Sequence, residues 1–227
     1  VLELACNDGV HRLSGQRIGP ATGTLQEHRT YDAFLDAFRQ QLAALVALAT
    51  DCNDRFAAAH AAVHPTPLLS ALIDGTAESG RDVTHGGARY NSSGVGVVGL
   101  ADVTDSLAAL AELVYGSKPR LTPAALQAAL EDDFQGHDGV RALLVNKGPK
   151  YGADDPRADA HAVALTELVQ DTFAAHRNWR GGAYHIGYWG VTLHAGAFAT
   201  VGSLPNGRRQ GMPLASGATP VSGAARR

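Results

Sequence analysis

The chain has 227 residues, of which 45% are hydrophobic and 18% are charged, and its formal net charge is -3. This composition predicts a folded globular protein and argues against a disordered chain. No basic face is evident, so nucleic acid and anionic membrane surfaces are poor partners, and the apolar runs are too short to span a bilayer. No segment resembles a secretory leader, so we expect a cytoplasmic protein.

Both ends of the sequence and its cysteines bear on its organisation. The chain begins with Val1 rather than methionine and ends on Arg226 and Arg227 directly after a loop-like segment, so we expect a fragment of a longer protein. Two cysteines, Cys6 and Cys52, are too few for a disulfide framework. Cys52 falls within a helical pattern, where we expect a small buried apolar residue.

The first 24 residues form a cysteine loop. Residues 1–5 (VLELA) predict a short strand, and the turn formers Asn7, Asp8 and Gly9 follow Cys6. A strand that carries a cysteine to the tip of a tight turn holds a reactive side chain on a rigid support. The alternative is an ordinary buried cysteine at the end of a strand.

Helices dominate the middle of the chain. A long helix is expected from Tyr31 to about His60, with Thr30 as its N-cap, because apolar residues recur every three or four positions. His60 and His64 lie four apart, but the segment HAAVH lacks the glutamate of a zinc-protease motif. Further helices are expected from Thr66-Pro67 to Gly75, after the cap Thr104 to Val114, after the cap Thr122 with Pro123 following, after the cap Asp138 to Asn146, and from Pro156 to Phe173.

Strands are expected mainly near the end of the chain. Residues 183–201 predict one or two buried strands with glycine breaks, because small or apolar residues stand two apart. The alternating residues are Val191, Leu193, Ala195, Ala197 and Ala199. Capped helices together with fewer, glycine-rich strands indicate an α/β fold.

Several glycine-rich and proline-rich motifs are spread along the chain in a fixed order. They are PTPLLS (65–70), GGARYN (86–91), DSLAA (105–109), PKYG (149–152), PNGRR (205–209), GMPL (211–214) and TPVS (219–222). Together they resemble the glycyl radical enzymes of the pyruvate formate-lyase superfamily, in the glycerol and diol dehydratase-like branch. The resemblance covers nearly all 227 residues.

The resemblance implies a fold and a domain organisation. The family fold is a ten-stranded α/β barrel of two five-stranded half-barrels, with helices outside glycine-rich strands. Residues 1–227 would form part of the catalytic barrel domain, the C-terminal half-barrel, with the cysteine loop at residues 1–24. The N-terminal half-barrel and the C-terminal glycine-radical domain would be absent.

The resemblance also implies a chemistry for two residues. Cys6 falls at the position of the catalytic cysteine, whose thiyl radical takes a hydrogen atom from a small organic substrate. Cleavage of a C–O, C–N, C–S or C–C bond follows in lyases, dehydratases and decarboxylases. Asp8 stands where many members have a glutamate as general base, so a carboxylate is kept one methylene shorter; burial would raise its pKa into a useful range. The alternative is that Asp8 caps the turn with Gly9.

Other activities also fit the sequence. A fumarate-adding synthase lacks the glutamate, and pyruvate formate-lyase itself uses two adjacent cysteines, whereas Ala5 and Asn7 flank Cys6 here. A catalytically silent barrel that binds a ligand is an alternative of another class. A metal hydrolase that uses some of the ten histidines is a third.

The cofactors and partners follow from the resemblance. No cofactor is expected to bind within this chain. The glycyl radical would lie on the absent C-terminal domain, installed by a radical SAM activating enzyme, and the full-length form would be a homodimer acting on a small-molecule substrate.

Overall fold

The computed structural model describes residues 1–190, 192–196 and 199–224. The chain divides into two compact units, and each is described by itself. The first unit comprises Val1–Ala44, Gly96–Leu168 and Tyr188–Arg227, and the second comprises Leu45–Val95 and Val169–Gly187.

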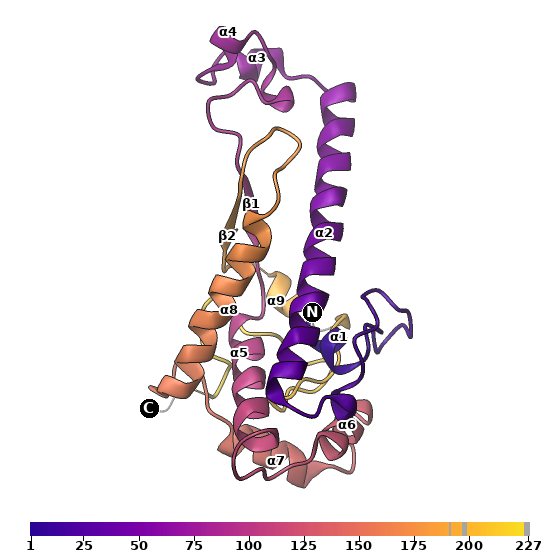
Figure 1. Cartoon of the computed structure of the whole chain (residues 1–227). Helices are drawn as coiled ribbons and strands as arrows, with labels where there is room; N and C mark the ends of the chain where they lie inside the picture. The colour runs from indigo at the N-terminus through magenta and orange to yellow at the C-terminus, as the bar shows by residue number, and fades with distance from the viewer. Residues whose placement is uncertain (191, 197–198, 225–227) are drawn as a thin grey trace. The chain divides into compact units, whose positions relative to one another are not determined.

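The first unit consists almost entirely of short helices joined by long loops (Figure 1). Helix α5 continues directly into a π-helical turn, η3, and helix α2 begins in this unit before it continues into the second. The elements are α1 (Leu2–Cys6), η1 (Leu25–Glu27), the start of α2 (Tyr31–Val63), α5 (Leu100–Ala109), η3 (Leu110–Val114), α6 (Pro123–Glu131), α7 (Asp138–Lys147), most of α8 (Pro156–Ala174) and α9 (Leu193–Gly196).

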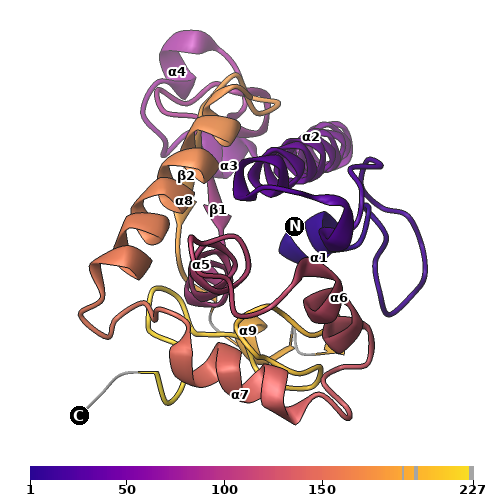
Figure 2. The ribbon, with the colours of Figure 1, turned by 60° about the horizontal axis from the view of Figure 1, so that its bottom comes forward.

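Helix α5 forms the centre of the first unit. Nine of its ten residues are buried, and in Figure 2 it is viewed nearly end on, with α1, α6, α7 and α9 around it. Helix α6 packs against η1 and α7. Each large apolar side chain that is fully buried stabilises the fold by about 1.5–3 kcal/mol. The most deeply buried are Leu25, Phe34, Leu110, Leu126, Leu130, Phe134 and Leu144.

The second unit contains the rest of α2, the end of α8 and a two-stranded sheet of β1 (Ser93–Gly96) and β2 (Tyr184–Gly187). Three short helices lie between α2 and β1: α3 (Pro67–Ser70), α4 (Thr76–Ser79) and η2 (Val83–His85).

The Asp82 carboxylate organises these short helices. It accepts hydrogen bonds from the Thr84 and Thr66 amides at 2.8 and 2.9 Å and from Ser70 Oγ at 2.9 Å. These bonds, those from Thr84 foremost, hold the pKa of Asp82 far below its usual range. A single side chain thus joins the starts of α3 and η2.

Four helix starts agree with the sequence prediction. Helices α2, α3, α6 and α8 begin at Tyr31, Pro67, Pro123 and Pro156. The caps of α2 and α6 are formed as expected: Thr30 Oγ1 accepts from the Ala33 amide and Thr122 Oγ1 from the Ala125 amide, both at 3.2 Å.

Other helix boundaries were predicted wrongly. Thr104 lies inside α5, which begins at Leu100 after Gly99, a glycine with φ of +89°. Asp138 is the first residue of α7 rather than its cap, and α3 ends at Ser70 rather than continuing to Gly75. The start of α5 was missed because its N-cap is a glycine in the left-handed conformation, which is commoner after a helix than before one.

The predicted strands correspond least well to the structure. Of residues 1–5, Leu2 to Ala5 lie in α1 instead of a strand. Among the described residues of 183–201, Tyr184–Gly187 is the only strand, and Leu193–Gly196 is the helical turn α9; Val191 and Ala197 lie outside the described residues. The alternating alanines mimic strand periodicity, but such small side chains bury too little surface to decide the local structure.

The described residues are therefore rich in helix with a two-stranded sheet, an α/β protein in which the expected half of a ten-stranded barrel stays a prediction. Cys52 is exposed on α2, so its predicted burial was wrong. Among the described residues, no helix is both long and apolar enough to cross a membrane.

Truncation of a core leucine tests the packing of the first unit. Leu130 is 1% exposed, so we expect Leu130→Ala to lower the free energy of unfolding by about 2–5 kcal/mol through lost burial and a residual cavity. Leu193→Ala is the control, because Leu193 is 65% exposed and its truncation leaves no cavity. Urea unfolding followed by circular dichroism measures both, and equal effects would contradict the assigned core.

Candidate functional site

Cys6 is the last residue of α1 and its side chain is buried, with 1% exposure. Burial raises the pKa of the thiol to about 12, although the nearby positive charge of Arg12 partly opposes the rise. The group is therefore an S–H at neutral pH. A nucleophilic cysteine needs the opposite shift, toward the thiolate, so this environment does not suit nucleophilic catalysis.

The turn after Cys6 reverses the chain immediately. The amides of Asn7 and Gly9 both donate to the carbonyl of Leu4, at 3.1 and 2.9 Å, and Asn7 Nδ2 donates to the carbonyl of Val10 at 2.8 Å. Asp8 has a φ of +52°, in the left-handed region that aspartate tolerates better than most residues. Cys6 thus lies directly before a turn, as predicted, although a helix rather than a strand leads into it.

Glu3 supports the turn from within α1. Its Oε1 accepts from the Arg12 amide at 2.8 Å, and its Oε2 accepts from the Gly202 amide at 3.0 Å. The Arg12 guanidinium in turn donates to the carbonyl of Leu130 at 3.2 Å. Glu3 and Arg12 therefore fix the first half of the cysteine loop to α6 and to the segment that follows residue 201.

The Asp8 carboxylate faces the second half of the same loop, residues 17–24, in which the chain returns toward the turn. Arg17 Nη2 donates to Oδ2 at 2.6 Å, and the Gly23 amide donates to Oδ1 at 2.7 Å. These partners, Arg17 first, lower the pKa of Asp8, and 29% of its side chain is exposed. The rise in pKa expected from burial is not found. Among the described residues, no hydrogen bond joins Asp8 to Cys6.

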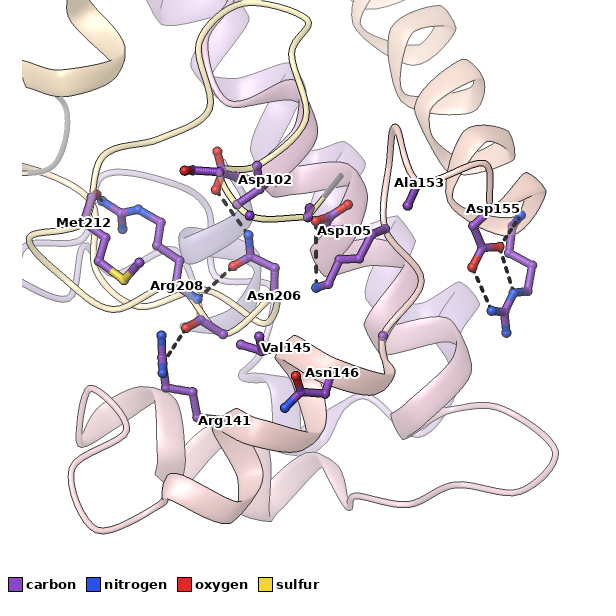
Figure 3. Close-up of a pocket in the computed structure, with 18 of the residues that line it drawn as sticks. Asp102, Asp105, Arg141, Val145, Asn146, Ala153, Asp155, Asn206, Arg208 and Met212 are labelled. Carbon is purple, nitrogen blue, oxygen red and sulfur yellow. Dashed lines mark hydrogen bonds and ion pairs between the residues drawn. The ribbon is translucent and has the colours of Figure 1, made fainter. Parts of the chain in front are cut away.

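A second polar cluster lies on α5. The Asp102 carboxylate is 1% exposed and accepts from the Ala215 amide at 2.7 Å and from Asn206 Nδ2 at 3.2 Å. Ser106 Oγ donates to the Asp102 carbonyl at 2.7 Å and accepts from the Asn206 amide at 3.1 Å. Helix α5 thereby holds the segment with the PNGRR motif (Figure 3).

Arg208 shapes the same segment from inside. The residue is 4% exposed, and its guanidinium donates to the carbonyls of Gly202 at 2.8 Å and Val201 at 3.1 Å, and also to that of Met212. Asn206 Oδ1 accepts from the Arg208 amide at 3.0 Å. The PNGRR motif is therefore a buried support in the described structure.

Asp105 and Lys150 form a buried pair on the other side of the cluster. Asp105 Oδ1 accepts from the Tyr151 amide at 2.8 Å, while Oδ2 lies 3.8 Å from Lys150 Nζ, too far for a hydrogen bond. Burial raises the pKa of Asp105 to about 6 and lowers that of Lys150. Desolvation therefore outweighs attraction at this distance.

These residues border a cavity of about 690 Å³ in the first unit (Figure 3). Its lining includes Asp102, Asp105, Lys150, Asn206 and Arg208. Cys6 does not line it. Within the described part of the chain, no three histidine, cysteine, aspartate or glutamate side chains gather as a metal site would require.

Sequence reasoning did not identify Arg17, Glu3 or Asp102. The partner of a turn aspartate nine positions away has no sequence signature. Asp102 and Asp105, by contrast, stand three apart on a helix whose other residues are mostly small or apolar, and that pattern could have indicated buried carboxylates.

Comparison with known proteins adds independent evidence. The family model described as pyruvate formate lyase-like matches residues 1–197. Trans-4-hydroxy-L-proline dehydratase of Clostridioides difficile is 33% identical over 98% of this chain and 28% of its own length. The (2S)-3-sulfopropanediol dehydratase of Klebsiella oxytoca is 29% identical over 97% of this chain and 27% of its own length.

Solved structures agree. Hydroxyproline dehydratase from C. difficile with its substrate bound superposes with a TM-score of 0.95 at 31% identity, over 99% of this chain and 28% of that one. A glycyl radical enzyme from Archaeoglobus fulgidus gives a TM-score of 0.92 at 35% identity, over 99% and 28%. The chain thus spans little more than a quarter of the length of these relatives.

The Asp105 carboxyl predicts a pH dependence of stability. Its folded pKa of about 6 exceeds the ordinary value of 3.8, so its contribution is present below pH 4 and is lost as the pH rises through 6. Relative to Asp105→Asn, the wild type should lose about 2–3 kcal/mol of unfolding free energy between pH 4 and 7. Urea unfolding at several pH values measures the difference.

The control for this series is Asp36→Asn, which changes an exposed carboxylate that pairs with Arg39 on the surface of α2. If the curves of unfolding free energy against pH ran parallel for the wild type and Asp105→Asn, the pKa of Asp105 would be the same in the folded and unfolded states, and the prediction would be wrong.

Proposed function

Because the chain belongs to the pyruvate formate lyase-like family of glycyl radical enzymes, we propose that it is the cysteine-bearing part of a radical lyase or dehydratase in which Cys6 abstracts the hydrogen atom. The observation that carries the proposal is the buried, protonated thiol of Cys6. Hydrogen-atom exchange requires an S–H bond, and burial preserves that bond at neutral pH.

The proposed step balances as follows. The Cys6 sulfur, in its radical form, takes a hydrogen atom from a substrate carbon, so a C–H bond breaks and an S–H bond forms. For C–O cleavage, the carbon radical expels the neighbouring hydroxyl as hydroxide, which departs as water with a proton from an O–H or N–H group on the radical carbon; the Cys6 thiol then returns a hydrogen atom to the remaining product radical. When present, a glycyl radical supplies the unpaired electron for this chemistry.

The role of the protein is to hold and shield Cys6. The side chain is fixed between α1 and a turn whose amides are bonded to Leu4, and its burial excludes water. Position alone would make Asp8 the general base, but its two carboxylate oxygens accept from Arg17 and Gly23. These donors stabilise the ionised form and so weaken Asp8 as a proton acceptor.

The relatives indicate a substrate class. Their names describe dehydratases that act on hydroxyproline and on sulfopropanediol. We therefore propose a small substrate with a hydroxyl or sulfonate group beside the reacting C–H bond, and C–O cleavage as the first choice. A fumarate-adding or formate acetyltransferase-like reaction is less well supported, the latter because Ala5 stands beside Cys6.

A catalytically silent barrel that binds a ligand is the second candidate. The observation that favours it is the ionised Asp8, which is held by Arg17. For the enzyme, the proposed partners are a radical SAM activating enzyme and a second copy of the full-length protein, and the proposed location is the cytoplasm.

A cysteine comparison tests the proposal. The complete gene product, with whatever chain flanks these 227 residues, is activated anaerobically by a radical SAM activating enzyme and given small diols, 4-hydroxyproline and hydroxysulfonates. Cys6→Ser should abolish turnover while the glycyl radical remains visible by electron paramagnetic resonance. Cys52→Ser, which changes an exposed residue, should retain activity. Turnover by Cys6→Ser, or no turnover by a wild type that carries full radical, would refute the enzymatic proposal.

A further inference from the structure

We propose that Arg17 is a positioning residue for Cys6. Asp8, Arg17 and Gly23 form a latch that holds closed the turn directly after Cys6 (residues 7–9), called the cysteine turn below. The inference assigns Asp8 to the latch instead of to proton transfer. Its catalytic consequence rests on the proposed function of Cys6, whereas its structural content does not.

The backbone around the latch is paired in register. The Asp8 amide donates to the Gly23 carbonyl at 3.1 Å, and Asn7 forms a bridge with Thr24. The amides of Ile18 and Gly19 both donate to the Gly9 carbonyl at 3.0 Å. The turn that follows Cys6 therefore lies directly against the returning half of the loop.

Arg17 closes this arrangement from outside. Its Nη2 donates to Asp8 Oδ2 at 2.6 Å and its Nη1 donates to the Asp8 carbonyl, so one guanidinium binds both the side chain and the backbone of the same residue. The opposite carboxylate oxygen accepts from the Gly23 amide at 2.7 Å. Charge-assisted, two-point contacts of this kind fix orientation as well as distance.

The inner side of the loop leaves little space for movement. A Cβ on Gly9 would lie 2.2 Å from the Pro20 carbonyl oxygen, so the two halves of the loop touch at this position. Gln41 of α2 is fully buried, and its Nε2 donates to the Pro20 carbonyl at 2.7 Å and to Thr22 Oγ1 at 2.8 Å. The returning half is thereby fixed to α2, and Asp8 links the cysteine turn to it.

The same contacts make Asp8 a poor base. A general base needs a lone pair directed at the proton and a pKa near the ambient pH. Both Asp8 oxygens have donors within the loop, and the Arg17 contact holds the pKa of Asp8 below its usual range. Its short side chain suits a contact within the loop.

A latch matters for radical chemistry because atom transfer depends on placement. A misplacement of about 1 Å can lower a rate a hundredfold. Asp8 lies two residues after Cys6, so opening of the latch releases the turn that fixes the end of α1.

The two cysteines provide the test in the complete gene product, with whatever chain flanks these 227 residues. The native protein is labelled with iodoacetamide, and mass spectrometry measures the labelling rate of each cysteine. Buried Cys6 reacts only when the turn opens, and exposed Cys52 serves as the internal reference. Wild-type Cys6 should react far more slowly than Cys52. Equal rates in the wild type would overturn the proposal, because the turn would then be open.

Arg17→Gln should accelerate Cys6 labelling about three- to tenfold, with the Cys52 rate unchanged, since the lost contact is charge-assisted but partly solvent-exposed. Asp8→Asn should have the same effect, because asparagine still accepts from Gly23 and tolerates the positive φ. Arg17→Lys should recover part of the protection.

The double variant Asp8→Asn, Arg17→Gln should label no faster than about twice either single variant, because both remove one interaction. Arg39→Gln is the matched control, since it breaks an exposed ion pair with Asp36 outside the loop. An unchanged Cys6 rate in Arg17→Gln, or additive effects in the double variant, would refute the latch.

A nuclear magnetic resonance titration of the Asp8 carboxyl gives a second readout, which fold destabilisation alone would not change. The latch requires a pKa below the ordinary range in the wild type and a higher one in Arg17→Lys and Arg17→Gln. A wild-type pKa near neutrality would instead support the base. Neither readout depends on turnover, so failure of the latch and failure of the Cys6 proposal are separately visible.

Discussion

Two buried carboxylates on one helix impose the main constraint on the first unit. Asp102 and Asp105 lie one turn apart on α5, and each is 1% exposed, so each must find hydrogen-bond donors inside the protein. Asp102 obtains them from Asn206 and the Ala215 amide, and Asp105 from the Tyr151 amide. Two loops remote in sequence are thus folded against α5 because the buried carboxyl groups on that helix require hydrogen-bond partners.

This constraint explains which structural features could be predicted from the sequence and which could not. The start of α6 carries a local signal, a capping threonine followed by proline, and it was predicted correctly. The PNGRR and PKYG motifs were visible as motifs, but their physical role was not. It depends on Asp102 and Asp105, which are about 100 and 45 residues away along the chain. Periodicity reports local structure and cannot report such pairings.

In the cysteine loop, too, sequence periodicity could not report which residues pair, although the partners are close in sequence. Residues 1–5 were predicted as a strand, yet Leu2, Leu4 and Ala5 are all buried in α1, and a segment buried on every side has no face by which periodicity separates strand from helix. The turn at Asn7, Asp8 and Gly9 was predicted correctly from residue type alone. The role of Asp8 was not, because the burial that would raise its pKa is absent and its partner, Arg17, lies across the loop.

Cys6 and Asp8, two residues apart, occupy opposite environments, and that contrast bears on mechanism. Desolvation keeps the Cys6 thiol protonated, while Arg17 keeps the Asp8 carboxylate ionised. A proton relay between them would require matched pKa values. Hydrogen-atom transfer makes no such demand on the carboxylate, since it moves a proton and an electron together at sulfur. A loop that fixes Cys6 with an ionised carboxylate, while burying the thiol, is therefore compatible with radical chemistry and poorly suited to acid–base catalysis through Asp8.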